Sequence, residues 1–264
     1  PGTGTVSLDG RGVPSLGGLT PATGNPVYLD VLGNQLVSAY FGDNRLRVHD
    51  VGGAPPHAQT DTADTDVEPH AATRHSDTQF YVPHRNGESV QQWSLDGEGT
   101  LTPGARTAGP GGTGPRHIAF HPNGELAYLI EEYTDRIGAY RIEGDGSLSL
   151  IARASTLPDG VDGDSNTCAD VHITPDGQFV YGTNRGHDSI AMFRVEPDGS
   201  LASLGTVSSE ARPREMDLSP DGRFVVAAGQ DSGALQSYRI EPDGTLTSIE
   251  RLDVGPGLRW VLID

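Results

Sequence analysis

The sequence predicts an all-β protein made of short strands joined by tight turns, and two observations carry this prediction. The 36 glycines and 19 prolines make up about a fifth of the 264 residues, a composition that favours strands and turns over long helices. Runs rich in β-branched and aromatic residues lie between Asx-Gly turns, for example 127–130, 136–142 and 148–152. We therefore expect helix to make up less than about a tenth of the chain.

These strands repeat at a nearly constant interval. The entry to a short apolar strand recurs near residues 26, 69, 115, 169, 213 and 256, at steps of 43, 46, 54, 44 and 43 residues. An Asp-Gly pair precedes the final strand of the unit five times, as at 145–146 and 198–199. About four strands in roughly 45 residues are typical of one blade of a β-propeller. A β-sandwich would not repeat one turn at one phase, so we expect a single β-propeller domain spanning 1–264.

The sequence predicts the number of blades less clearly than it predicts the repeat itself. Six entry positions are countable, and the last is followed only by an expected strand at 258–263. Residues 4–8 and 16–20 resemble the third and fourth strands of a blade. In a closed ring these N-terminal strands would complete the C-terminal blade and remove its open edge. The alternatives are a six-bladed ring with one short blade, or a longer chain whose N-terminal blade is missing or incomplete.

Charge excludes several classes of partner. The formal net charge is −18, and all 18 basic residues are arginine. Such an acidic surface repels phosphate backbones, which argues against nucleic acid, and no apolar run approaches the roughly 18 residues of a membrane-spanning helix. Hydrated carboxylates suit a high-salt cytoplasm. A GC-rich genome would explain the missing lysine but not the acidic excess, so we expect a halophilic, cytoplasmic protein.

Several motifs together resemble one known family. They are Gly114-Pro115-Arg116-His117-Ile118-Ala119-Phe120-His121-Pro122, Ala169-Asp170-Val171-His172-Ile173-Thr174-Pro175-Asp176-Gly177 and Thr183-Asn184-Arg185-Gly186-His187-Asp188-Ser189-Ile190. The chain resembles the seven-bladed propeller lactonases, which include 6-phosphogluconolactonases and the related 3-carboxymuconate cyclases. The resemblance extends from about residue 69 to the C-terminus. It implies seven blades, so that this chain is short by roughly one blade at its N-terminus.

Basic and histidine side chains recur where the blades begin. The residues at entry positions are His70, Arg116, His117, Asp170, His172 and Arg214. Two further residues follow second strands, namely Glu132 and Arg185. Because the first strands of a propeller line its central channel, residues about 45 apart meet at one rim. We expect an electropositive island that binds a small anion through guanidinium groups.

The resemblance implies roles for these residues. It implies a catalytic set of His70, Arg116, Glu132 and Arg185, and we expect His117, His172 and Arg214 to bind substrate. Either Glu132 or His70 would take the proton from water, while the two catalytic arginines hold the oxyanion and the substrate's anionic group. Arginines beside Glu132 would lower its pKa and weaken it as a base, which favours His70.

Three functions remain open at this point. Hydrolysis of a sugar lactone, with 6-phosphogluconolactone as the preferred substrate, is the interpretation that the resemblance favours. A lactonising cycloisomerase acting on a carboxylated diene acid would use the same arginines, and a non-enzymatic propeller would serve as a binding platform. The sequence has no His-Glu-x-x-His motif and no Asp-rich loop with a bidentate Glu, so we expect neither a metal nor another cofactor.

Overall fold

The structure is a computed structural model that describes residues 2–8, 14–21, 25–53 and 57–263. Every regular element in these ranges is a strand, as the composition predicted. Backbone contacts divide the chain into two compact units, Pro1–Ala108 and Gly109–Asp264. In the described ranges no helix has the length and apolar character needed to cross a membrane.

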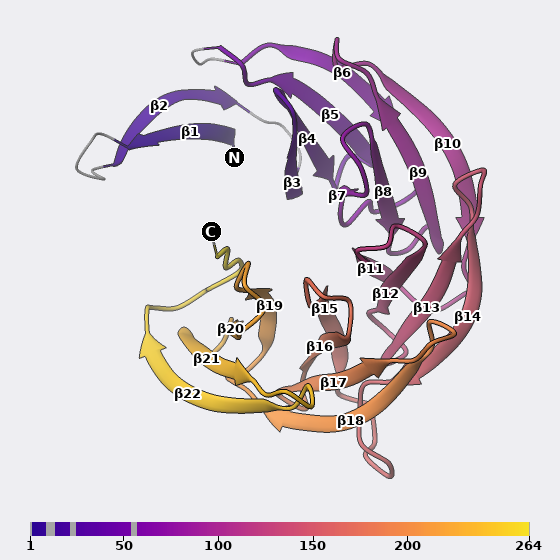
Figure 1. Cartoon of the computed structure of the whole chain (residues 1–264). Coiled ribbons are helices and arrows are strands. Elements are labelled where there is room, and N and C mark those ends of the chain that lie inside the picture. The colour runs from indigo at the N-terminus through magenta and orange to yellow at the C-terminus, as the bar shows by residue number, and fades with distance from the viewer. Residues whose placement is uncertain (1, 9–13, 22–24, 54–56, 264) are drawn as a thin grey trace. The chain divides into compact units, whose positions relative to one another are not determined.

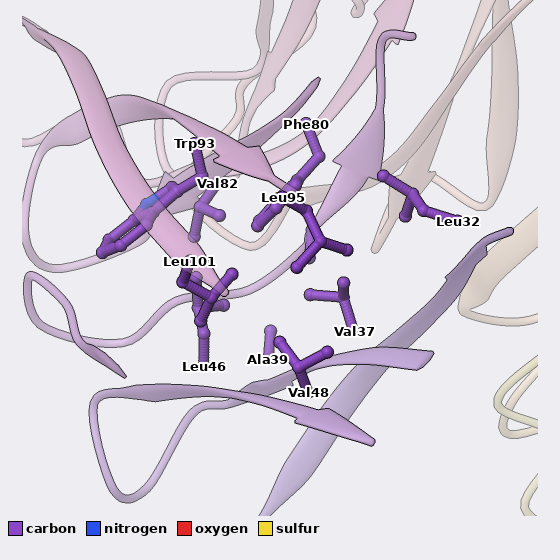
Figure 2. Packing of buried hydrophobic residues seen from close by; sticks show 11 residues of the cluster. Leu32, Val37, Ala39, Leu46, Val48, Phe80, Val82, Trp93, Leu95 and Leu101 are labelled. Carbon is purple, nitrogen blue, oxygen red and sulfur yellow. The ribbon is translucent and has the colours of Figure 1, made fainter. Parts of the chain in front are cut away.

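The first unit contains one hairpin and two four-stranded sheets. The hairpin pairs β1 (Gly2–Leu8) with β2 (Pro14–Pro21). The sheets consist of β3 (Pro26–Leu32), β4 (Gln35–Tyr40), β5 (Arg45–Asp50) and β6 (Gln59–Asp64), and of β7 (Thr73–Arg74), β8 (Gln79–His84), β9 (Ser89–Leu95) and β10 (Leu101–Ala108). Alternating apolar side chains from both sheets form one core, in which Leu46, Phe80 and Trp93 are buried (Figure 2).

The second unit contains three four-stranded sheets with the same order. They consist of β11 (Pro115–Phe120), β12 (Leu126–Glu131), β13 (Arg136–Ile142) and β14 (Leu148–Ser155); of β15 (Thr167–Ile173), β16 (Phe179–Arg185), β17 (Ser189–Val195) and β18 (Leu201–Ser208); and of β19 (Pro213–Leu218), β20 (Phe224–Gly229), β21 (Ala234–Ile240) and β22 (Leu246–Asp253). Within each sheet the strands are antiparallel and follow chain order (Figure 1). Two apolar clusters fill the spaces between these sheets.

The five four-stranded sheets confirm the predicted repeat, and the strands at 2–8 and 14–21 confirm the N-terminal pair. The predicted entry positions are correct at Pro26, Pro115 and Pro213, where strands begin. Pro69 forms only an isolated bridge with His84, and β7 begins four residues later.

Two details of the predicted repeat are wrong. Cys168 pairs with Asn184 as Pro115 pairs with Glu131, so the fourth entry lies at 168 and not 169. No proline marks this entry, which follows a longer loop. The expected strand at 258–263 is also absent from the described C-terminal residues. Gly255 and Gly257, with φ of 132° and 81°, turn the backbone away from an extended path there.

A β-bulge recurs at the start of the first strands. The register shifts by one residue between Pro115 and His117 in β11 and between Pro213 and Glu215 in β19, so that Arg116 and Arg214 are the extra residues. In β15, Ala169 and Asp170 together stand opposite Thr183. A bulge interrupts the alternation of a strand and changes the direction of a side chain. This local irregularity gives three neighbouring strands a common place for a side chain.

Candidate active site

The Arg116 side chain is the centre of the candidate site in the second unit. It is completely buried, and its Nη2 donates a hydrogen bond to Glu215 Oε1 at 3.1 Å. Its Nη1 donates to the main-chain carbonyl of Ala169 in the adjacent strand β15. Its Nε lies 4.0 Å from Glu132 Oε2 and has no hydrogen-bond partner in the described chain. Arg116 therefore reaches across one sheet to a carboxylate on the next.

Glu132 lies between two guanidinium groups. It follows β12, and its Oε1 accepts a hydrogen bond of 2.8 Å from Nη2 of Arg185, the last residue of β16. The same Arg185 nitrogen donates to the carbonyl of Cys168 at 2.7 Å. Burial, followed by repulsion from Arg116, lowers the pKa of Arg185. The structure thus brings together three of the four predicted catalytic residues, Arg116, Glu132 and Arg185.

Glu215 was not predicted from the sequence as a site residue. It is 3% exposed and bonds to Arg116. Burial, together with the nearby Asp170 carboxylate, raises the pKa of Glu215 to about 8 although Arg116 opposes the shift. Near neutral pH this carboxyl group therefore binds a proton more readily than an ordinary glutamate does.

Asp170 organises a second group of polar side chains. Its carboxylate contacts His117 Nδ1 at 2.8 Å and His172 Nε2 at 3.1 Å, and it accepts hydrogen bonds from the main-chain N–H groups of Val171 and Met216. Burial opposes ionisation, but His172 and these hydrogen bonds hold the pKa of Asp170 well below its usual value. The carboxylate is therefore ionised across the neutral range.

The two histidines beside Asp170 have opposite tendencies. Burial, together with repulsion from Arg116, lowers the pKa of His117 to about 4. For His172 burial also opposes the charged form, but attraction to the Asp170 carboxylate prevails and raises the pKa to about 9. At neutral pH His117 is neutral and His172 carries a proton. Both lie in the group around Asp170, as expected for residues near the site.

The C-terminal residues pack against this second group. The Trp260 ring lies 6.4 Å from the His117 ring, between centroids. The main-chain N–H of Ile263 donates to Asp217 Oδ2 at 2.8 Å, and Asp217 Oδ1 lies 3.7 Å from His172 Nδ1. The segment expected to form a strand thus covers the histidine side of the site.

Arg214 is partly buried beside these groups. It directly precedes Glu215, whose carboxylate accepts the hydrogen bond from Arg116. Burial lowers the pKa of Arg214 to about 10, and the positive charge of Arg116 contributes to the shift. The described residues give Arg214 no hydrogen bond and no ion-pair partner. Substrate binding by Arg214, His117 and His172 stays a prediction.

His70, the remaining predicted catalytic residue, belongs to the first unit. It is buried, its main-chain N–H donates to the Pro83 carbonyl at 2.9 Å, and its ring meets Phe41 edge-on with centroids 5.7 Å apart. Its role beside Arg116, Glu132 and Arg185 stays a prediction.

One group of side chains in the described chain has the spacing of metal ligands. Donor atoms of His117, Asp170 and Glu215 lie within 4.8 Å of one another. Two of these carboxylates already accept hydrogen bonds, Asp170 from backbone N–H groups and Glu215 from Arg116. These contacts explain the closeness of the three residues without an ion.

A correct alignment of the repeats would have revealed this group. His117, Asp170 and Glu215 each stand two residues after the entry residue, at 115, 168 and 213. Placing the fourth entry at 169 aligns Asp170 with Arg116 and hides the shared position. The available signal was therefore the register of the repeat and not a local motif.

Comparisons with known proteins agree with this architecture. The family model described as a lactonase with a seven-bladed β-propeller matches residues 14–263. A 6-phosphogluconolactonase of Yersinia pestis is 33% identical over 213 residues, which cover 76% of this chain and 62% of the relative. The 6-phosphogluconolactonase of Serratia proteamaculans is 33% identical over 231 residues, covering 83% of this chain and 69% of the relative. The chain thus spans less than two thirds of the Yersinia protein.

Solved structures share the fold. A Lactobacillus plantarum protein superposes with a TM-score of 0.87 at 24% identity, covering 97% of this chain and 79% of its own. A periplasmic gluconolactonase of Pseudomonas aeruginosa gives a TM-score of 0.86 at 24% identity, covering 96% and 78%. Together with the family match, these similarities show that the chain belongs to the lactonase family of seven-bladed β-propellers.

Proposed function

We propose that this protein hydrolyses a sugar lactone and that its preferred substrate is 6-phosphogluconolactone. Family membership and the names of the Yersinia and Serratia relatives support this proposal. The observation that carries it is the Glu132 carboxylate, held at 2.8 Å by Arg185 and flanked by Arg116. The two buried guanidinium groups of Arg116 and Arg185 suit a reaction in which an anionic substrate develops further negative charge.

The proposed reaction adds water to the carbonyl carbon of the lactone. The oxyanion of the tetrahedral intermediate would lie against the guanidinium groups of Arg116 and Arg185. When the ring C–O bond breaks, the leaving oxygen takes a proton and the product is a hydroxy acid. Oxyanion stabilisation of this kind contributes about 10²–10³ in rate.

Glu132 is a poor base in this arrangement because two cations stabilise its ionised form. We assign it to holding the arginines in place, and we assign proton abstraction from water to His70, because an imidazole group can accept a proton near neutral pH. General-base catalysis contributes about 10²–10⁴ in rate.

The direct test is proton release after mixing with freshly generated 6-phosphogluconolactone, with unphosphorylated gluconolactone in parallel. We expect release above the spontaneous rate, and its loss in the Arg116→Ala, Arg185→Ala double variant. Arg239→Gln is the matched control, because Arg239 is exposed and forms an ion pair with the nearby Glu241. Full activity in the folded double variant, or no activity in the wild type, would contradict the proposal.

We also propose that the protein works in a salt-rich cytoplasm. The net charge of −18 supports this, since dissolved ions screen repulsion between carboxylates. The melting temperature should rise as KCl is raised toward molar concentration. A lower melting temperature in molar KCl would contradict this proposal.

A further inference from the structure

Three neighbouring strands have bulges, and two of these bulges contain an arginine. Strand β15 packs beside β11 and beside β19. The bulge residue is Arg116 in β11 and Arg214 in β19, whereas β15 has Ala169 and Asp170 opposite Thr183. The small Ala169 side chain leaves its carbonyl accessible to Arg116 Nη1. Two arginines therefore flank a strand that contributes no long basic side chain at the corresponding point.

Arg116, Arg185 and Arg214 differ in whether a carboxylate compensates their charge. Arg185 is 2.8 Å from the Glu132 carboxylate, and Arg116 is 3.1 Å from that of Glu215. Arg214 has no ion-pair partner in the chain as described, although it is partly buried and close to Arg116 and Arg185. A desolvated cation without a counterion costs free energy, and a bound anion removes that cost.

We propose that Arg214 binds the phosphate group of a phosphorylated sugar lactone and thereby sets the preference of the site for phosphorylated over neutral lactones. This inference rests on the proposed lactonase function. The planar guanidinium group presents paired N–H donors that match two phosphate oxygens. Arg116 and Arg185 are each paired with a carboxylate and are assigned to the oxyanion, so Arg214 is the arginine best placed to bind an additional dianion.

The electrostatic setting supports phosphate over a neutral hydroxyl. Near Arg214 the three arginine charges are opposed by Glu132 and by Glu215. The Glu215 carboxyl group is partly protonated near neutral pH, as described above. The charge around Arg214 is therefore positive, whereas the net charge of the whole protein is −18. A dianionic group is therefore attracted to this point and repelled by most of the remaining surface.

The test compares Arg214→Gln with the control Arg239→Gln, which removes the same charge from an exposed ion pair. The measured quantity is the ratio of kcat/KM for 6-phosphogluconolactone to kcat/KM for gluconolactone. We expect this ratio to fall about 10- to 100-fold in Arg214→Gln, mainly through KM, as for loss of a charged hydrogen bond. Arg239→Gln should retain the wild-type ratio. Arg214→Lys, which keeps the charge but not the fork, should lie between them.

A binding measurement separates this inference from the function on which it rests. Calorimetric titration with 6-phosphogluconate should show at least about tenfold weaker binding to Arg214→Gln than to the wild type and to Arg239→Gln. An equal decrease in kcat/KM for both lactones, or unchanged binding of 6-phosphogluconate, would overturn the role of Arg214. Neither result would contradict the proposed lactonase function. If the wild type hydrolyses neither lactone, the proposed function fails, and titration with inorganic phosphate still tests the Arg214 site.

Discussion

Arg85 in the first unit and Arg185 in the second stand at corresponding places in their sheets. Arg85 directly follows β8, and Arg185 ends β16. Arg85 forms an ion pair of 3.0 Å with Glu68, which lies at the entry to the same sheet. The two side chains are 24% and 20% exposed. Arg185 pairs at 2.8 Å with Glu132 from the neighbouring sheet, and their side chains are 4% and 8% exposed.

The two ion pairs differ in energetic cost. Water still solvates the Arg85 pair, and the guanidinium carbon also lies 4.6 Å from the Phe41 ring centre. Such a pair is inexpensive to form and adds little stability. Burying Arg185 and Glu132 requires the removal of water from both charges, a cost that attraction between them does not reliably exceed. Stability alone therefore does not account for the buried pair, which agrees with the catalytic role proposed for it.

Substitution of each arginine by methionine should separate the two regions most strongly. Arg185→Met leaves Glu132 buried without its closest cation, so we expect unfolding free energy to fall by about 3–5 kcal/mol. The proposed lactonase turnover per folded molecule should fall about 10²–10³-fold. Urea unfolding and proton release provide the two measurements. A variant as stable and as active as the wild type would remove the distinction between the pairs.

Glu132→Gln tests the same network with little change in shape. The amide retains one acceptor for Arg185 but leaves two adjacent guanidinium groups without a shared counter-charge. We expect a loss of about 1–3 kcal/mol in stability and a lower kcat. If kcat per folded molecule is unchanged, Glu132 serves packing alone.

The pH dependence of stability should also differ between the regions. Burial lowers the pKa of His84, in the first unit, to about 4. The contribution of His84 to the free energy of unfolding is therefore complete above about pH 6.5 and is lost as the pH falls through 4. The pKa of His172 is raised to about 9, so its contribution is complete below about pH 6.5 and is lost as the pH rises through 9.

Two variants check these opposite directions. His84→Asn should reduce the acid loss of stability between pH 6.5 and 4, a loss to which His117 also contributes. His172→Gln should reduce the alkaline loss between pH 6.5 and 9. Urea midpoints measured across both ranges provide the readout. An alkaline profile identical in His172→Gln and the wild type would contradict the His172–Asp170 pairing.

Arg85→Met should have the smallest effect. Loss of a partly solvated ion pair and of a cation–π contact predicts a decrease of about 1 kcal/mol or less in unfolding free energy. Glu68→Gln is the companion variant, and its effect should be similar. A loss as large as that of Arg185→Met would show that exposure does not distinguish the two pairs.

The sequence predicted the sheets well because their signals are local. Apolar runs between Asp-Gly turns determine each strand, and the resemblance to the lactonase family selected Arg116, Glu132 and Arg185, which the structure brings together. Glu215 could not be found in this way. It acts through a contact with Arg116 across 99 positions of sequence, and only the register of the bulged strands places the two side chains together.

The recurring bulge has a consequence for how such a protein diversifies. A residue inserted into a strand is released from the inside–outside alternation that the core imposes on its neighbours. Arg116, Ala169 and Arg214 show that this place accepts a long cation or a methyl group while the pairing on either side continues. Each of these three repeats thus contains one position where natural variation can alter ligand preference without disturbing folding.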